Sequence, residues 1–288
     1  MTTPPDRVVT DLSDRRAAIL DVIRGARRSI SLSLFRCNDE QVFEELARAT
    51  SRGVAVDVLM TARAKGGGRK LEKLRDALTR AGAIVDTYAD PVAKYHAKYL
   101  VADEGPAVVA SLNFTRKCFD RTIDAVVVTY DPDVVSGLRD LMATDRAGQP
   151  SSAAISPRLI VGPERARQRF TALLTGARHS IRIIDAKLSD PDLVTLLNDR
   201  RKDGVTVDLY GSKRLGGFKS HGKILLVDST IAVIGGLALS ALSLDFRREV
   251  AITIEDPVGI AAVERLFESV TSTPPAGPIT AGHDDART

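Results

Sequence analysis

The 288-residue chain carries the same segment twice, and this repeat limits its fold more than any other feature. Residues 19–30 read as an amphipathic helix that ends at a glycine, then a basic pair and the start of a strand, and residues 170–181 repeat this pattern. Residues 52–58 likewise return at 203–209, again 151 positions later. A repeat of this length predicts two similar units that pack together.

Both halves also carry the string H-x-K-x4-D, with a further acid 28 residues after the histidine. The string and the acid comprise His96, Lys98, Asp103 and Asp124 in the first half, and His221, Lys223, Asp228 and Glu249 in the second. These matches are 125 positions apart instead of 151, so the second half lacks 26 residues. The missing piece corresponds to residues 69–90 and their flanks, which read as a helix and a short strand at 83–87.

The order of elements favours an α/β fold in which each half is a mixed β-sheet flanked by helices, the two halves packing about a pseudo-twofold axis. Residues 99–102 and 224–227 are near-continuous apolar runs, typical of buried central strands. The motif histidine and lysine begin such a strand two residues apart, so both point to one face. We expect five segments: a flexible N-terminus (1–12), the first half (13–145), a linker (146–157), the second half (158–270) and a disordered tail (271–288).

Composition narrows the class of protein. The net charge of +4 and pI near 9.1 permit a phosphate-bearing partner without requiring one. The sequence contains no apolar run of 18 residues and no secretory signal, which predicts a cytoplasmic protein with free thiols at Cys37 and Cys118. We expect both cysteines to be bystanders. The absence of Trp argues against a protein that inserts into a membrane, and also against one that binds single-stranded nucleic acid by base stacking.

On these motifs the chain resembles the phospholipase D superfamily, which is defined by paired H-x-K-x4-D strings. The resemblance covers roughly residues 13–270 and implies a phospholipase D-like fold. In that family a Gly-Ser-x-Asn segment follows each motif. Here the first copy is Ala110-Ser111-Leu112-Asn113, and the second, Gly235-Gly236-Leu237-Ala238, has lost the hydroxyl and the amide.

The resemblance implies a metal-independent phosphodiesterase that uses two histidines and needs no cofactor. One histidine attacks phosphorus and becomes phosphohistidine, and the other protonates the leaving alcohol. Lys98, Lys223 and Asn113 would hold the phosphate. We assign His96 as the nucleophile and His221 as the acid/base, because the donors Ser111 and Asn113 lie in the first half.

The acids divide into two groups. Asp124 and Glu249 match the family's carboxylates that orient the histidines, and the resemblance suggests crossed pairs, Glu249 with His96 and Asp124 with His221. Same-half pairing is left open by the sequence. Asp103 and Asp228 end the motif strands and are expected to fix a turn.

Several polar residues could contact the substrate. Matched basic, glycine-rich loops at 61–68 and 212–217 are either solvated loops or a rim that attracts anions, and they contribute the candidates Lys65 and Arg214. Ser111 and Arg116 are the further candidates. No additional cluster has metal-ligand spacing, so no metal is expected.

Three functions fit these residues. We favour a phospholipid phosphodiesterase, because the net charge is low for a nucleic-acid enzyme. Such an enzyme would either hydrolyse the lipid or transfer a phosphatidyl group, and it could contact a membrane peripherally. A DNA or RNA endonuclease and a degenerate phosphate-binding protein are the alternatives. Both half-sites lie in one chain, which predicts a monomer.

Overall fold

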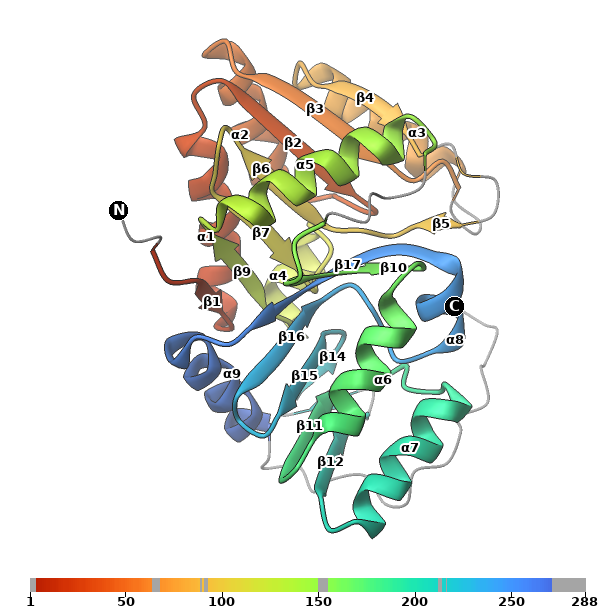
Figure 1. The fold of residues 1–288 in the computed structure, drawn as a ribbon. Coiled ribbons are helices and arrows are strands. Elements are labelled where there is room, and N and C mark those ends of the chain that lie inside the picture. Colours follow the sequence, from red (N-terminus) through yellow and green to blue (C-terminus); the bar gives the residue numbers. More distant parts are fainter. Residues whose placement is uncertain are drawn as a thin grey trace.

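The computed structural model describes residues 4–63, 68–88, 90, 93–149, 155–211, 214–215 and 217–270. Nine helices and seventeen strands lie within these ranges (Figure 1). The helices are α1 (Leu12–Gly25), α2 (Glu40–Ser51), α3 (Gly68–Arg80), α4 (Arg116–Arg121), α5 (Pro132–Arg146), α6 (Ala166–Gly176), α7 (Pro191–Lys202), α8 (Ala241–Phe246) and α9 (Pro257–Val270).

The first half is built on one mixed sheet, ordered β1-β9-β7-β6-β2-β3-β4. The motif strand β6 is central and fully buried, as its apolar sequence predicts. The strands of this sheet are β1 (Arg7–Val9), β2 (Ser29–Leu34), β3 (Ala55–Met60), β4 (Ile84–Thr87), β6 (Tyr99–Ala102), β7 (Ala107–Ala110) and β9 (Val126–Thr129).

The second half repeats this order as β10-β17-β16-β15-β11-β12. Among the described residues it has no counterpart of α3 or β4, which confirms the location of the missing 26 residues. Its strands are β10 (Leu159–Gly162), β11 (Ser180–Ile184), β12 (Thr206–Tyr210), β15 (Lys223–Val227), β16 (Ile231–Gly235) and β17 (Arg247–Ile254).

Short strands join the halves. In one link, β5 (Lys94–Tyr95) of the first half pairs in parallel with β17 of the second. In the other, β8 (Thr122–Ile123) pairs with β14 (Phe218–Ser220), which also pairs with β13 (Arg214–Leu215). Each motif histidine directly follows one of these linking strands, so the links determine where the histidines lie.

A shared core lies between the two sheets. It joins Tyr99 and Val109 of the first sheet to Leu226 and Ile252 of the second, and it also contains the apolar faces of α5 and α9. Separate outer cores lie under α1, α2 and α3 and under α6 and α7. Figure 1 shows α5 across one face of the first sheet, α6 across the second sheet, and α7 at the far end of the second half. Because the central core draws on both halves, we expect them to unfold together.

Two aspartates fix equivalent turns at the ends of the motif strands. Asp103 accepts hydrogen bonds from the backbone N–H groups of Arg27, Arg28 and Ser29, at 2.7–2.9 Å. Asp228 accepts from residues 178–180 at 2.7–2.8 Å. Both have positive φ, 46° and 51°, a conformation that Asp tolerates better than most residues. The predicted structural role of the motif acids is confirmed.

The chain ends need one correction. Residues 7–9 form β1, which pairs with β9, and α1 begins at Leu12, so the flexible N-terminus predicted for residues 1–12 does not extend through this segment. Valines at positions 8 and 9 cover apolar core, which orders the strand. The predicted linker at 146–157 begins where α5 ends. Its residues 150–154 and the predicted tail 271–288 lie outside the described residues.

Among the residues that the structure describes, no helix combines the length and the apolar character needed to cross a bilayer.

Candidate active site

Two histidine–carboxylate pairs cross between the halves. The Nδ1 atom of His96 contacts Glu249 Oε1, and His221 Nδ1 lies 3.1 and 3.2 Å from the two carboxylate oxygens of Asp124. The predicted crossed pairing is therefore confirmed. Each half supplies one histidine and the acid that orients the other half's histidine.

Backbone pairing brings each histidine to its acid. The N–H of His96 donates to the carbonyl of Arg248, 2.9 Å away, at the residue before Glu249. The N–H of Gly222, next to His221, donates at 2.7 Å to the carbonyl of Ile123, the residue before Asp124. A Cβ at position 222 would lie 2.8 Å from that carbonyl oxygen, so this approach requires glycine.

A buried ion-pair network holds β17 in place behind Glu249. Arg248 of the second half pairs with Asp145 of α5 at 2.9 Å and with Glu164 at 2.6 Å. The guanidinium and the Asp145 carboxylate are almost fully buried. The network therefore connects the two halves directly beside the candidate site.

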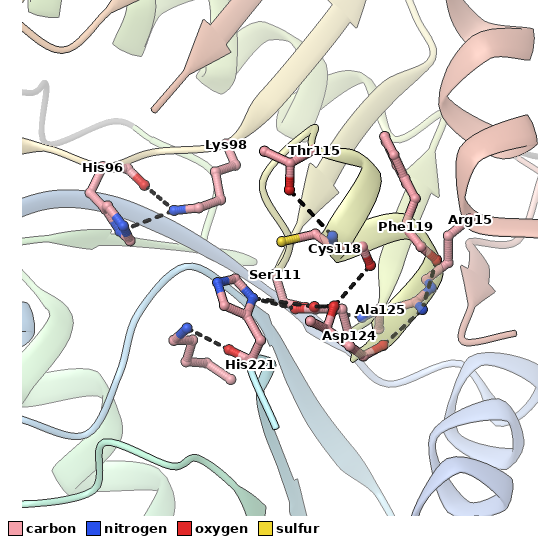
Figure 2. A network of polar contacts seen from close by, with 12 residues as sticks. Arg15, His96, Lys98, Ser111, Thr115, Cys118, Phe119, Asp124, Ala125 and His221 are labelled. Carbon is pink, nitrogen blue, oxygen red and sulfur yellow. Dashed lines mark hydrogen bonds and ion pairs between the residues drawn. The ribbon is translucent and has the colours of Figure 1, made fainter. Parts of the chain in front are cut away.

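The motif lysines are buried at the same boundary. Lys98 and Lys223 each donate from Nζ to the backbone carbonyl of their own motif histidine. Lys98 Nζ also lies 3.0 Å from His96 Nδ1, and a Cβ on Gly236 of the second half would be 3.5 Å from it. Figure 2 shows His96 and Lys98 opposite His221, with Asp124 beyond the His221 ring.

Positive charge accumulates around His96. Burial, followed by the charges of Lys98 and Lys223, lowers the pKa of His96 well below its ordinary value, and Arg247 and Lys187 act in the same direction. Burial is also the main reason that the pKa of Lys98 falls to about 7. Closely spaced, desolvated cations favour a bound anion, because an anion relieves their mutual repulsion.

The surroundings shift the pKa values of the two pairs to different extents. Burial lowers the pKa of both histidines; at His221 the charge of Asp124 opposes this shift, whereas at His96 the next largest causes, the charges of Lys98 and Lys223, lower the pKa further. Burial also raises the pKa of Glu249. Burial also tends to raise the pKa of Asp124, but the charge of His221 and three hydrogen bonds have the larger effect, so the pKa of Asp124 is lowered.

Hydroxyl groups hold both acids. Ser111 Oγ donates to Asp124 at 2.7 Å, and Thr122 Oγ1 donates to its other oxygen at 2.5 Å. In the second half, Ser243 of α8 donates to Glu249 and accepts from the N–H of Ala238. The hydroxyl lost from the second Gly-Ser-x-Asn segment is thus supplied from a helix, which the motif comparison did not reveal.

The remaining predicted residues have different surroundings. Ser111 is fully buried and its hydroxyl also accepts from Ala125 N, so its expected contact with substrate is corrected to a contact with Asp124. Asn113 is buried, and its Oδ1 has no partner among the described residues. Arg116 is exposed and pairs with Glu40. Arg214 lies on β13, and the substrate contacts of these two arginines stay predictions. Lys65 lies outside the described residues.

Sequence analysis missed two neighbours of the histidines. Phe35, at the end of β2, packs against the His96 ring with centroids 4.2 Å apart. Cys118 of α4, expected to be a bystander, lies beside Asp124 and His221. The sequence held one signal that could have drawn attention to this cysteine. Cys118 lies 125 positions before Ser243, so the two residues hold equivalent places in the repeat.

One comparison with known proteins finds a related domain in the first half. The family model described as "Cardiolipin synthase, PLD-like domain" matches residues 19–146. Among curated proteins, no sequence matches significantly.

Two solved structures have a similar fold. Polyphosphate kinase from Porphyromonas gingivalis superposes with a TM-score of 0.75 and 20% identity, over 96% of this chain and 48% of the kinase. The chain thus spans about half the length of that protein. Phosphatidylserine synthase from Haemophilus influenzae gives a TM-score of 0.69 and 14% identity, over 92% of this chain and 86% of the synthase.

Proposed function

We propose that the chain is a member of the phospholipase D superfamily and that it cleaves phosphodiesters at the His96–His221 site without a metal. The matched family model over residues 19–146 and the similar folds support this proposal. One observation carries the proposal: the crossed pairs bring a histidine and a lysine from each half to one boundary. Two histidines can divide the nucleophile and acid/base roles between them, and the lysines can neutralise the phosphate.

In the first step His96 attacks phosphorus. Its Nε2 lone pair forms the P–N bond while the P–O bond to the leaving alcohol breaks, and protonated His221 gives its proton to the departing oxygen. Lys98 and Lys223 neutralise the non-bridging oxygens. Glu249 accepts a hydrogen bond from the Nδ1–H group of His96, which keeps Nε2 free and stabilises the positive charge that forms on the ring.

The second step reverses these roles. His221, now neutral, takes a proton from water or from an acceptor alcohol, whose oxygen attacks phosphorus and releases His96. Water gives hydrolysis, whereas an alcohol gives transfer to a new diester. Both outcomes use the same groups and balance without a cofactor.

The different pKa shifts of the two histidines support His96 as the nucleophile. A nucleophile must be neutral, and burial together with the surrounding cations lowers the pKa of His96 most strongly. The proton donor must be able to hold a charge; burial lowers the pKa of His221 overall, but the charge of Asp124 opposes this fall. An arriving phosphate would also raise the pKa of His221.

We propose a phospholipid as the substrate, with peripheral contact between the protein and the lipid surface. The matched family model is named for cardiolipin synthase, and one protein of similar fold is a phosphatidylserine synthase. The modest net charge of +4 fits this substrate better than a nucleic acid.

A substrate screen tests the proposal. The purified chain would be incubated, in excess EDTA, with phosphatidylglycerol vesicles, plasmid DNA, single-stranded DNA, RNA and inorganic polyphosphate, alongside the His96→Ala and His221→Ala variants. We expect phosphatidate or a new phospholipid from the vesicles, and no product with either variant. Cleavage of DNA or RNA alone would establish the nuclease alternative. Binding without turnover on every substrate would establish the degenerate phosphate-binding alternative.

A further inference from the structure

Three unlike ligand groups meet beside one catalytic pair. The ligand atoms of Cys118, Asp124 and His221 all lie within 4.8 Å of one another. In the part of the chain that the structure describes, this is the one such group of three. We propose that these residues bind Zn²⁺ and that the bound ion inhibits the enzyme. The inhibitory role rests on the proposed function, whereas the binding does not.

The distances suit a zinc ion. Zinc–ligand bonds of about 2.0–2.3 Å in tetrahedral geometry separate two ligand atoms by about 3.3–3.8 Å. His221 Nδ1 and the Asp124 oxygens are already 3.1 and 3.2 Å apart. Cys118 completes the set with a small approach of its sulfur, and water would supply the fourth ligand.

The position of Cys118 is fixed by its helix. The Cys118 N–H donates to the capping Thr115 Oγ1 at 3.2 Å, and Arg15 holds the end of α4 by donating to the carbonyls of Phe119 and Thr122. Figure 2 shows the sulfur, in yellow, on the same side of α4 as the Asp124–His221 pair. The His221 side chain is 23% exposed, which leaves the ion a route to the site.

The ligand chemistry selects a borderline or soft ion. A thiolate and an imidazole favour Zn²⁺ over Mg²⁺ or Ca²⁺, which prefer oxygen. Binding releases the thiol proton, and the proton on His221 Nδ1 moves to Nε2. The ion then replaces Asp124 as the partner of Nδ1, so that His221 can no longer exchange protons as its mechanism requires.

Among the described residues, the second half offers no equivalent group of ligands. Ser243 holds the position that corresponds to Cys118, and its hydroxyl donates to Glu249 and accepts from the Ala238 N–H. Neutral serine hydroxyls are not among the usual zinc ligands. The repeat therefore predicts one ion for each chain, at the acid/base histidine alone.

The experiment titrates ZnCl₂ into the full chain without substrate, by calorimetry. The variant is Cys118→Ser, which reproduces the arrangement of the second half, and the matched control is Cys37→Ala, which removes a buried free cysteine outside the cluster. We expect one tight site in the wild type and in the control, and affinity weakened at least about tenfold in Cys118→Ser. Circular dichroism checks that each variant is folded.

Cobalt gives a second readout that does not depend on activity. Co²⁺ should produce a near-ultraviolet thiolate charge-transfer band in the wild type and in Cys37→Ala, but not in Cys118→Ser. Equal zinc affinity in the wild type and in folded Cys118→Ser would overturn the site. Once a substrate is known, zinc should inhibit the wild type, and EDTA should restore its rate. Tight binding without inhibition would overturn the regulatory part alone.

Discussion

The two half-sites share a backbone plan but differ in the groups around each histidine. His221 pairs with a short acid that two hydroxyls hold, from Ser111 and Thr122. His96 pairs with the longer Glu249, held by Ser243, and Lys98 lies beside the same ring nitrogen. The comparison shows how a duplicated unit can diverge: the fold preserves both pairs, while the neighbouring charges shift the pKa values of the two histidines to different extents.

The support of each acid shows the same divergence. In the first half a serine at the end of β7 holds Asp124, whereas the equivalent position in the second half is Gly236, close to Lys98. A hydroxyl from α8 replaces it at Glu249. The requirement for a donor to the buried carboxylate is preserved, although the residue that meets it has changed.

The largest expected effect comes from removing either histidine. His96→Ala and His221→Ala should each reduce kcat by about 10⁴-fold or more, because each removes a partner in both steps. Trapping the covalent intermediate with labelled substrate, under a quench that is not acidic, shows which histidine is the nucleophile. The His221→Asn variant should retain phosphohistidine at position 96. Label recovered at His221 in a His96→Asn protein would reverse the assignment.

Neutralising the acids tests whether the crossed pairs function as pairs. Glu249→Gln and Asp124→Asn should each lower kcat by about 10²- to 10⁴-fold, since an amide can stabilise the wrong imidazole tautomer and cannot stabilise a charged ring. Nitrogen chemical shifts of the imidazoles should show the tautomer change at His96 in the first variant and at His221 in the second. A change at the same-half histidine would contradict the crossed arrangement.

The lysine beside His96 predicts a pH dependence. A lysine is charged below its pKa, and burial lowers the pKa of Lys98 to about 7, so its charge is lost as the pH rises through 7. We expect kcat/KM to fall at least about tenfold for each pH unit above that point, because the first step also needs protonated His221. The value of kcat should fall only at higher pH, since bound phosphate raises the pKa of both groups.

A Lys98→Arg variant shows whether Lys98 or His221 causes the fall of kcat/KM at high pH. Arginine stays charged, so a fall due to Lys98 should move to higher pH, even if the maximal rate is lower. A profile of kcat/KM that stays flat to pH 9 in the wild type would contradict the low pKa.

The supporting hydroxyls should have smaller effects on rate than on stability. Ser111→Ala and Ser243→Ala each leave a buried carboxylate short of a donor and a buried backbone N–H without its acceptor. We expect each to lower the free energy of unfolding by about 1–3 kcal/mol and kcat by only a few-fold. Urea unfolding measures the change in the free energy of unfolding, and steady-state kinetics measure the change in kcat. Loss of rate as large as in the acid variants would give the hydroxyls a direct role in the reaction.

The smallest expected effect is that of a chelator. Excess EDTA should leave the rate of zinc-free protein unchanged, because the lysines supply the positive charge that a divalent ion would otherwise provide. The measurement compares rates before and after exhaustive dialysis against EDTA. Complete loss of activity, restored by Mg²⁺ or Zn²⁺, would overturn the two-histidine mechanism.

The sequence determined the repeat, the α/β class, the motif strands and the histidines, lysines and acids of the site. These features were predictable because hydrophobic periodicity and fixed spacing are local properties of the chain. The 26-residue difference also located the α3–β4 unit that the second half lacks. The resemblance to a known family suggested the crossed pairing, but spacing alone fitted same-half pairs equally well.

Only the tertiary structure decided which side chains meet. Ser243 replaces a motif serine from another element, and Cys118 lies beside His221 although 103 residues separate them in sequence. The ion pair of Arg248 with Asp145 likewise joins elements of different halves. Such contacts depend on the packing of the two sheets and on the backbone pairing of β5 with β17 and β8 with β14, and no local pattern encodes that packing.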